Sequence, residues 1–280
     1  MLPASNSSEA PPFCARTPKV HRAPAEIARC LDTHRRARSP LSHGPLPALR
    51  QIADLDAVDD HQQIARLTCR QDFPFDTTRA LELALLRAFA IPRISALLDQ
   101  TGEFARAPQK RYDDTDILVS ELLENGYDSP NGRAAIRRMN QLHARFDIAN
   151  ADFLYVLSTF VFEPIRWIDR FGWRRLTDKE RTALFHFWRE VGRRMGIRDL
   201  PADSASFERF SLDYERREFV PAESNRRVAQ ANLVELRRQV AEQHELCGGA
   251  GIRGGRFVRL RVVLDVAEES GEDVQACVRH

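Results

Sequence analysis

Apolar residues recur at intervals of three and four along most of this chain, and several of these stretches carry their own helix start and stop signals. Ser129-Pro130 places a capping residue before a proline at the first helical position. Thr177–Glu180 (TDKE) is a capping box. The only good strand signal is Phe257–Val266. With strand signals so scarce, this pattern predicts an all-α protein.

The expected helices follow one another from about Leu49. Start signals lie at Asp76, at Asp113 or Asp114, and at Asp152, and glycines close two helices at 126 and 196. The expected ranges are 76 to 86 and beyond, with a break near residue 92, then 113–126, 130–146, 153–168, 178–196, 206–216 and 225–245.

Three segments of different composition divide the chain. Residues 1–45 are rich in Pro, Ser, Arg and His and predict a flexible arm, with one short helix near Ala25–Leu31. Residues 46–238 form the helical domain, and residues 239–280 form a divergent or poorly ordered tail. The fold class is therefore all-α, with a single multi-helix domain, a flexible N-terminal arm and an atypical C-terminal tail.

Composition excludes several classes of function. The 42 basic and 40 acidic residues give a formal charge of only +2, and the arginines are spread over many helices, so we expect no nucleic-acid partner. No apolar run is long enough to predict a transmembrane span. Five scattered cysteines, none in CxxC spacing, indicate free thiols in a reducing compartment, and with no signal peptide the expected location is cytoplasmic. Nothing in the sequence indicates an oligomeric state.

His143 lies on an apolar helix face. Ile136, Met139, His143 and Phe146 follow one another at spacings of three and four, so His143 points toward the core. This pattern alone leaves two interpretations open. The imidazole is either a core histidine satisfied by one hydrogen bond or a ligand to a bound group.

A cation and a hydroxyl stand at the inner end of the preceding helix. Arg111 and Thr115 are one turn apart, and Leu118 and Leu122 continue the same face. Arg111 either pairs with a nearby carboxylate, while Thr115 bonds back to its own turn, or the two flank a cofactor that carries carboxylates.

The helix expected over 153–168 is almost wholly apolar but contains Glu163 and Pro164. Burying a carboxylate without a partner is costly, so Arg166, Arg138 or Arg137 is expected to pair with Glu163. A structural ion pair is favoured over a catalytic role.

Other chemical motifs are weak. His186 lies among aromatic residues that favour core packing, and His61 looks like a surface residue at a helix start. Gly249–Gly254 formally matches GxGxxG but follows a helix, which disfavours dinucleotide binding. Ser158 lacks the hydrolase elbow, and there is no ordered carboxylate set for a di-iron site.

Four segments together resemble the MpaB-type oxygenase family, which also contains the latex-clearing rubber oxygenases. The resemblance covers about residues 55–230 and is carried by Phe73–Leu83 (FPFDTTRALEL), Arg111–Thr115 (RYDDT), Arg137–His143 (RRMNQLH) and Tyr155–Trp167 (YVLSTFVFEPIRW). Each segment alone is weak, whereas the ordered set is fairly specific.

The resemblance implies an all-helical protein that binds haem b and uses dioxygen to cleave carbon–carbon double bonds of isoprenoid chains. His143 then matches the proximal iron ligand. Arg111 and Thr115 match the distal motif, where they pair with a propionate or position dioxygen. We add Arg138, on the helix of His143, as a third cofactor-binding candidate.

The chain departs from the family in three places. Asp114 stands where rubber oxygenases carry a lysine that can cap the iron, and Leu157 lies near the position of a second histidine found in many relatives. The stretch from about Gln239 matches nothing expected of the family.

The function expected is therefore a haem-dependent oxygenase acting with dioxygen on a hydrophobic alkene, with an isoprenoid as the candidate substrate. Two alternatives stay open, namely a helical scaffold without a cofactor and a non-catalytic haem or lipid carrier.

Overall fold

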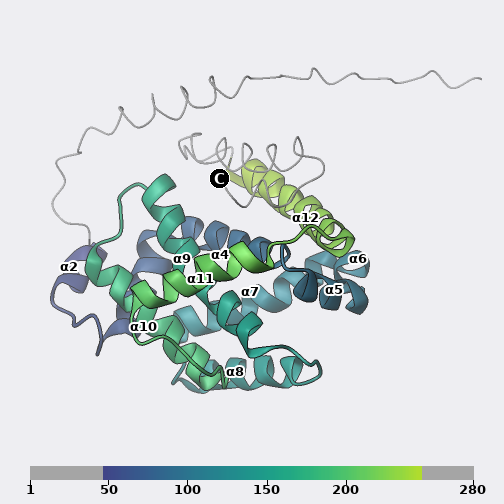
Figure 1. Ribbon diagram of the computed structural model, residues 1–280. Helices are drawn as coiled ribbons and strands as arrows, with labels where there is room; N and C mark the ends of the chain where they lie inside the picture. The colour runs from purple at the N-terminus through teal and green to yellow at the C-terminus, as the bar shows by residue number, and fades with distance from the viewer. Residues whose placement is uncertain (1–46, 248–280) are drawn as a thin grey trace, which may run out of the picture. The chain divides into compact units, whose positions relative to one another are not determined.

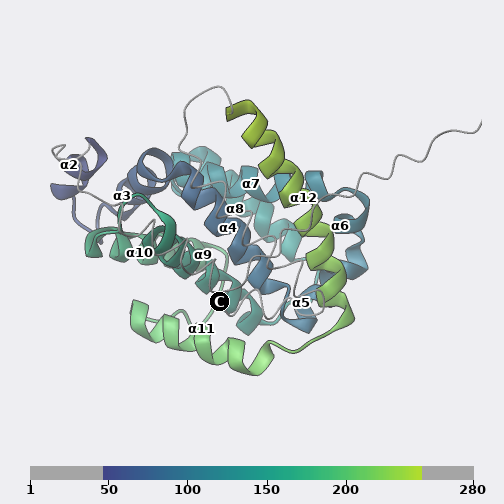
Figure 2. The same ribbon diagram turned by 90° about the horizontal axis from the view of Figure 1, so that it is seen from above.

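The computed structural model describes residues 47–247, and these residues form helices joined by short connections, with no strand among them. Figures 1 and 2 show their arrangement in two views. The helices are α2 (Pro47–Ala53), α3 (His61–Arg66), the π-helix η1 (Leu67–Asp72), α4 (Pro74–Ala88), α5 (Pro92–Thr101), α6 (Glu103–Arg106), α7 (Pro108–Asn125), α8 (Pro130–His143), α9 (Asn150–Phe171), α10 (Asp178–Arg194), α11 (Ser204–Glu218) and α12 (Glu223–Cys247). The predicted all-α class is confirmed for this part of the chain. The expected helix at 25–31, the strand at 257–266 and the glycine motif at 249–254 lie outside it.

Proline opens five of these helices because its fixed φ suits the first turn, where its missing N–H is not needed. Pro47, Pro74, Pro92, Pro108 and Pro130 occupy this place in α2, α4, α5, α7 and α8. The expected start at Asp113 or Asp114 is therefore wrong, since α7 begins at Pro108. Aspartate is a common capping residue, but Asp113 and Asp114 lie inside α7, whose first residue is Pro108.

Asp76 and Asp152 also differ from their expected role as caps. Both are buried, and both lie in the first turn of a helix rather than before it. Asp76 accepts a hydrogen bond from the Trp167 indole at 3.3 Å. Asp152 pairs with Arg93 at 3.1 Å and accepts a hydrogen bond from the Tyr214 hydroxyl. These carboxylates therefore join helices to one another.

Two predicted caps are confirmed. The Ser129 hydroxyl accepts a hydrogen bond from the Gly132 amide at 2.9 Å at the start of α8. At the start of α10, the Thr177 hydroxyl accepts from the Glu180 amide at 3.2 Å and the Glu180 carboxylate accepts from the Thr177 amide at 2.8 Å. Caps of this kind can be predicted from the sequence because the two hydrogen-bonding residues lie within four positions of each other.

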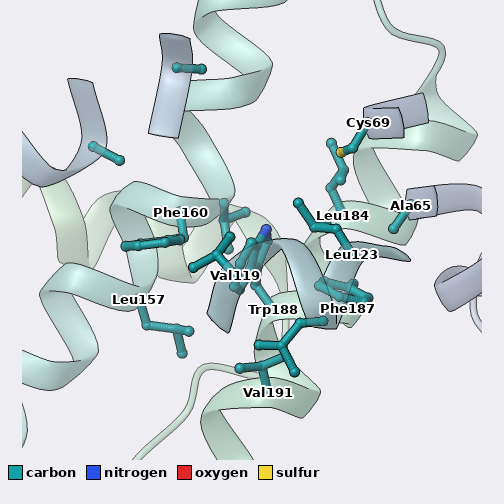
Figure 3. Close-up of a cluster of buried hydrophobic side chains, with 14 of the residues drawn as sticks. Ala65, Cys69, Val119, Leu123, Leu157, Phe160, Leu184, Phe187, Trp188 and Val191 are labelled. Carbon is teal, nitrogen blue, oxygen red and sulfur yellow. The ribbon is translucent and has the colours of Figure 1, made fainter. Parts of the chain in front are cut away.

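The main core lies where α4 and α9 pack along each other, with α7 and α10 against them. Figure 3 shows part of it, in which Leu157, Phe160, Trp188 and Val191 gather with Val119. The Phe160 and Trp188 rings meet edge to face with centroids 5.0 Å apart. Gly192 lets α9 approach α10, because a Cβ there would lie 2.4 Å from Leu157 Cδ2.

Helices α7 and α8 form an antiparallel hairpin that is held very closely at its turn. Gly126 has φ +76°, which a glycine adopts without strain. A Cβ at Gly132 would lie 2.0 Å from the Gly126 carbonyl oxygen and 2.8 Å from Tyr127 Cα. Because the turn fixes the register of the hairpin, the first turns of α7 and the last turn of α8 lie at the same end.

Within residues 47–247, no helix combines the length and the apolar character needed to cross a bilayer.

We predict that Gly132→Ala destabilises the fold by about 1–3 kcal/mol, because the added methyl meets backbone atoms that cannot rotate away. Urea denaturation followed by circular dichroism measures the effect. Asn131→Ala, one residue earlier and exposed, is the matched control and should change little. Equal stability of the two variants would contradict the close approach.

Candidate functional site

His143 is the last residue of α8, and its ring packs edge-on against Phe153 of α9 with centroids 5.2 Å apart. Its Nδ1 is buried, and neither ring nitrogen makes a hydrogen bond to any described residue. Burial, and then the charge of Arg111, lower the pKa of His143, so the imidazole is held neutral. The core histidine satisfied by one hydrogen bond is thus not what the structure shows.

Arg111 and Thr115 form a pair in the first turns of α7. An Nη1–H of Arg111 donates to the Thr115 hydroxyl, which in turn donates to the Arg111 carbonyl at 3.3 Å. The guanidinium lies over the Phe104 ring, 5.4 Å from its centroid. Among the described residues no carboxylate forms an ion pair with it, and burial lowers the pKa of Arg111. A mostly buried cation therefore has hydrogen-bonding capacity left over.

The hairpin brings the three predicted residues to one end of α7 and α8. Burial is the main cause of the lowered pKa of His143, and the positive charge of Arg111 adds to it, so the two groups lie in one electrostatic environment. Partly buried apolar side chains from α7, α8 and α9 pack around the same core, namely Leu118, Met139, Phe153 and Val156. The result is an imidazole and a guanidinium, both short of partners, in apolar surroundings.

The side chains present favour a haem iron over a metal ion held by protein ligands alone. No group of three or more His, Cys, Asp or Glu residues in the described part of the chain is arranged to hold a metal ion. A single neutral imidazole suits an iron that already has four porphyrin nitrogens. An unpaired buried guanidinium suits a cofactor that carries carboxylates.

Arg138 does not join this group. It is exposed on the outer face of α8, about 140° around the helix from His143 at 100° per residue. Asp114 is also exposed and pairs with Lys110 at 2.5 Å. Leu157 is 5% exposed and packs against Gly192. None of these three side chains adds a polar group to the site.

His186 belongs to a separate cluster between α3 and α10. Its ring centroid lies 6.2 Å from that of His61. The His61 Nδ1–H donates to the Val58 carbonyl, and Nε2 accepts from the Tyr127 hydroxyl. His186 is therefore distinct from the site on α7 and α8.

Glu163 is the centre of a buried ion network, as the structural interpretation predicted. Its carboxylate pairs with Arg166 at 2.8 Å and with Arg87 at 3.3 Å, and Arg87 pairs with Glu215 at 2.7 Å. Arg166 is the partner named from the sequence. Arg87, on α4, was missed because the contact joins residues far apart in the chain, and Arg137 and Arg138 are exposed instead.

A second buried polar network was also missed. Arg79 is 2% exposed and pairs with Glu82 at 2.7 Å, and the Tyr112 hydroxyl donates to Glu82 at 2.7 Å. Burial raises the pKa of Glu82 to about 7. No sequence signal was available, because an arginine and a glutamate three apart usually indicate a solvated face.

Comparison with known proteins gives the family. The sequence profile described as "ER-bound oxygenase mpaB/B'/Rubber oxygenase, catalytic domain" matches residues 77–263. The chain belongs to this family. The match includes Arg111, Thr115 and His143, and it extends past Gln239. The expectation that the chain is unlike the family from that residue is therefore wrong for 239–263.

Two named relatives in this family have similar sequences. The chain is 35% identical to "ER-bound oxygenase mpaB" of Penicillium roqueforti over 193 residues, which are 62% of the chain and 65% of the relative. It is 34% identical to "ER-bound oxygenase mpaB'" of Penicillium brevicompactum over 208 residues, 68% of the chain and 48% of the relative. The chain thus spans about half to two thirds of the length of these relatives.

We predict that Arg87→Met destabilises the fold by about 3–5 kcal/mol at neutral pH, because it leaves Glu163 and Glu215 buried with less positive charge. Urea denaturation at neutral pH tests this. Arg226→Met, which breaks the exposed pair with Glu223, is the control and should change the stability little.

Proposed function

We propose that this protein is a haem-dependent oxygenase that uses dioxygen on a hydrophobic alkene, with an isoprenoid chain as the favoured substrate class. Family membership supports the oxygenase activity, since the relatives carry that name. The observation that supports haem binding is a neutral imidazole without a hydrogen bond near a part-buried guanidinium that forms no ion pair among the described residues.

The residues present fit haem b. His143 would ligate the iron through a ring nitrogen, because the neutral imidazole exposes a lone pair. Arg111 would hold a propionate through its remaining N–H groups. When bound, the haem supplies the iron chemistry that activates dioxygen.

The chain's own side chains then have three tasks. Phe153 fixes the plane of the His143 ring by edge contact, in place of the hydrogen bond that usually orients a ligating imidazole. The hydroxyl of Thr115 accepts from Arg111 and holds the guanidinium in one orientation. The apolar side chains around them exclude water and provide contacts for an apolar chain.

The absorption spectrum of protein purified with haem supplied is the test of the ligand. We expect a stoichiometric Soret band, which His143→Ala abolishes or shifts to that of a different ligation state. His186→Ala, with a histidine removed from the separate α3–α10 cluster, is the control and should retain the normal band. An unchanged spectrum in His143→Ala would sink the ligand assignment.

Arg111→Gln should weaken haem binding about tenfold to a hundredfold, the scale of one charge-assisted hydrogen bond. Titration of the haem-free protein with haem measures the affinity. Lys110→Gln removes the same charge from the neighbouring exposed position and should leave the affinity unchanged. If both variants bind haem equally well, Arg111 does not hold the propionate.

Thr115→Val removes the hydroxyl that orients Arg111 and that would also position dioxygen, so at saturating haem it should lower oxygen uptake with an isoprenoid alkene about a hundredfold. An oxygen electrode measures the uptake against free haem. Haem binding without any uptake by the wild type would identify a carrier, and a colourless protein would identify a scaffold.

A further inference from the structure

Helix α8 carries a basic outer face. Arg133, Arg137, Arg138 and Arg145 are all exposed. Three of them lie on α8 within an arc of about 140° at 100° per residue, and Arg145 follows in the turn after it. The buried residues Gly132, Ala135, Ile136 occupy the other side of the helix. The charge is thus concentrated on one face.

None of these four arginines forms an ion pair within the described chain. Elsewhere, exposed arginines on helices are commonly matched by a carboxylate three or four residues away, as in Arg216 with Asp213 and Arg226 with Glu223. Helix α8 contains no acidic residue at all. Arg133 donates to the backbone carbonyl of Asp128, and the Asp128 carboxylate pairs with Arg194. The positive charge of this face is therefore not neutralised by its neighbours.

An apolar side chain stands at one end of the basic face. Phe146 is 42% exposed and follows His143 by three residues, held by a turn in which its amide donates to the His143 carbonyl at 3.0 Å. Asp147 next to it is exposed and removes one unit of charge. Figure 1 shows α8 along the lower edge of the described helices, with its outer side open.

We propose that the outer face of α8 binds the surface of a bilayer that contains anionic phospholipid. A row of arginines complements lipid phosphates, which the guanidinium can engage with two hydrogen bonds. Phe146 adds an aromatic ring of the kind that partitions into the interface. A single-stranded nucleic acid fits less well, because Phe146 is the one exposed aromatic residue between Arg133 and Asp147, and successive bases would lack a series of rings on which to stack.

The inner face of the same helix presents His143, so docking would bring that end of the helix close to a lipid phase. An apolar substrate dissolves in that phase, and it would enter the protein without crossing water. This consequence rests on the proposed function, whereas the binding itself needs neither haem nor turnover. A failure of membrane binding is therefore distinguishable from a failure of the proposed oxygenase function.

Co-sedimentation of the full chain with vesicles tests the proposal. We expect binding to phosphatidylcholine vesicles that contain phosphatidylserine, and none to pure phosphatidylcholine. Binding should weaken at high salt, because the screening length falls from about 10 Å at 0.1 M to about 3 Å at 1 M. Arg137→Gln/Arg138→Gln should weaken it about 25-fold, at roughly fivefold for each arginine near an anionic surface.

The control is Arg209→Gln/Arg217→Gln, which removes two exposed arginines of α11 that form no ion pair within the described chain. It should bind as the wild type does, and an equal loss would overturn the assignment to α8. Phe146→Ser should also weaken binding without a change of charge. Circular dichroism checks that all variants fold, which the exposure of these positions favours. Equal binding to both vesicle types, or tighter binding to single-stranded RNA with the same arginine dependence, would overturn the proposal.

Discussion

The backbone contact between Gly132 and the Gly126 carbonyl sets the geometry on which the candidate site depends. Helix α8 can lie directly on the turn that follows α7 because a glycine has no Cβ at the contact. With the register of the hairpin fixed there, Arg111 and Thr115 at the start of α7 share an end of the structure with His143 at the end of α8. The functional groups are thus positioned by packing some distance away from them.

Buried charge ties the remaining helices to this hairpin. Arg87, Glu163 and Glu215 connect α4, α9 and α11, and Arg79 with Glu82 and Tyr112 connects α4 to α7. Each carboxylate is satisfied by at least one guanidinium or hydroxyl, so burial is compatible with folding. Unsatisfied buried nitrogens are not confined to the candidate site, since Nε and Nη1 of Arg79 also lack a hydrogen-bond partner. The candidate site is marked instead by a combination, namely a neutral imidazole without a hydrogen bond and, on the neighbouring helix, a part-buried guanidinium without an ion pair among the described residues.

The sequence predicted what depends on neighbours within one or two helical turns. The Ser129 cap, the Thr177 capping box and the inward direction of His143 all follow from local spacing. The helix starts predicted at Asp76, Asp113 and Asp152 were wrong. An aspartate before an apolar stretch is typical of a helix cap, and a long-range partner that gives it another role cannot be inferred from local sequence. The contacts of Arg87 and Phe104, and the exposure of Arg138, depend on how distant helices meet, which no local pattern encodes.

The central claim is that His143 of α8 holds an iron beside Arg111 and Thr115 of α7. An X-ray structure of the haem-loaded protein, with anomalous data at the iron edge, tests it directly. We predict one strong anomalous peak within coordination distance of a His143 ring nitrogen and a haem propionate in contact with Arg111. A peak beside His186, or no ordered iron near α8 in crystals of coloured protein, would contradict the account.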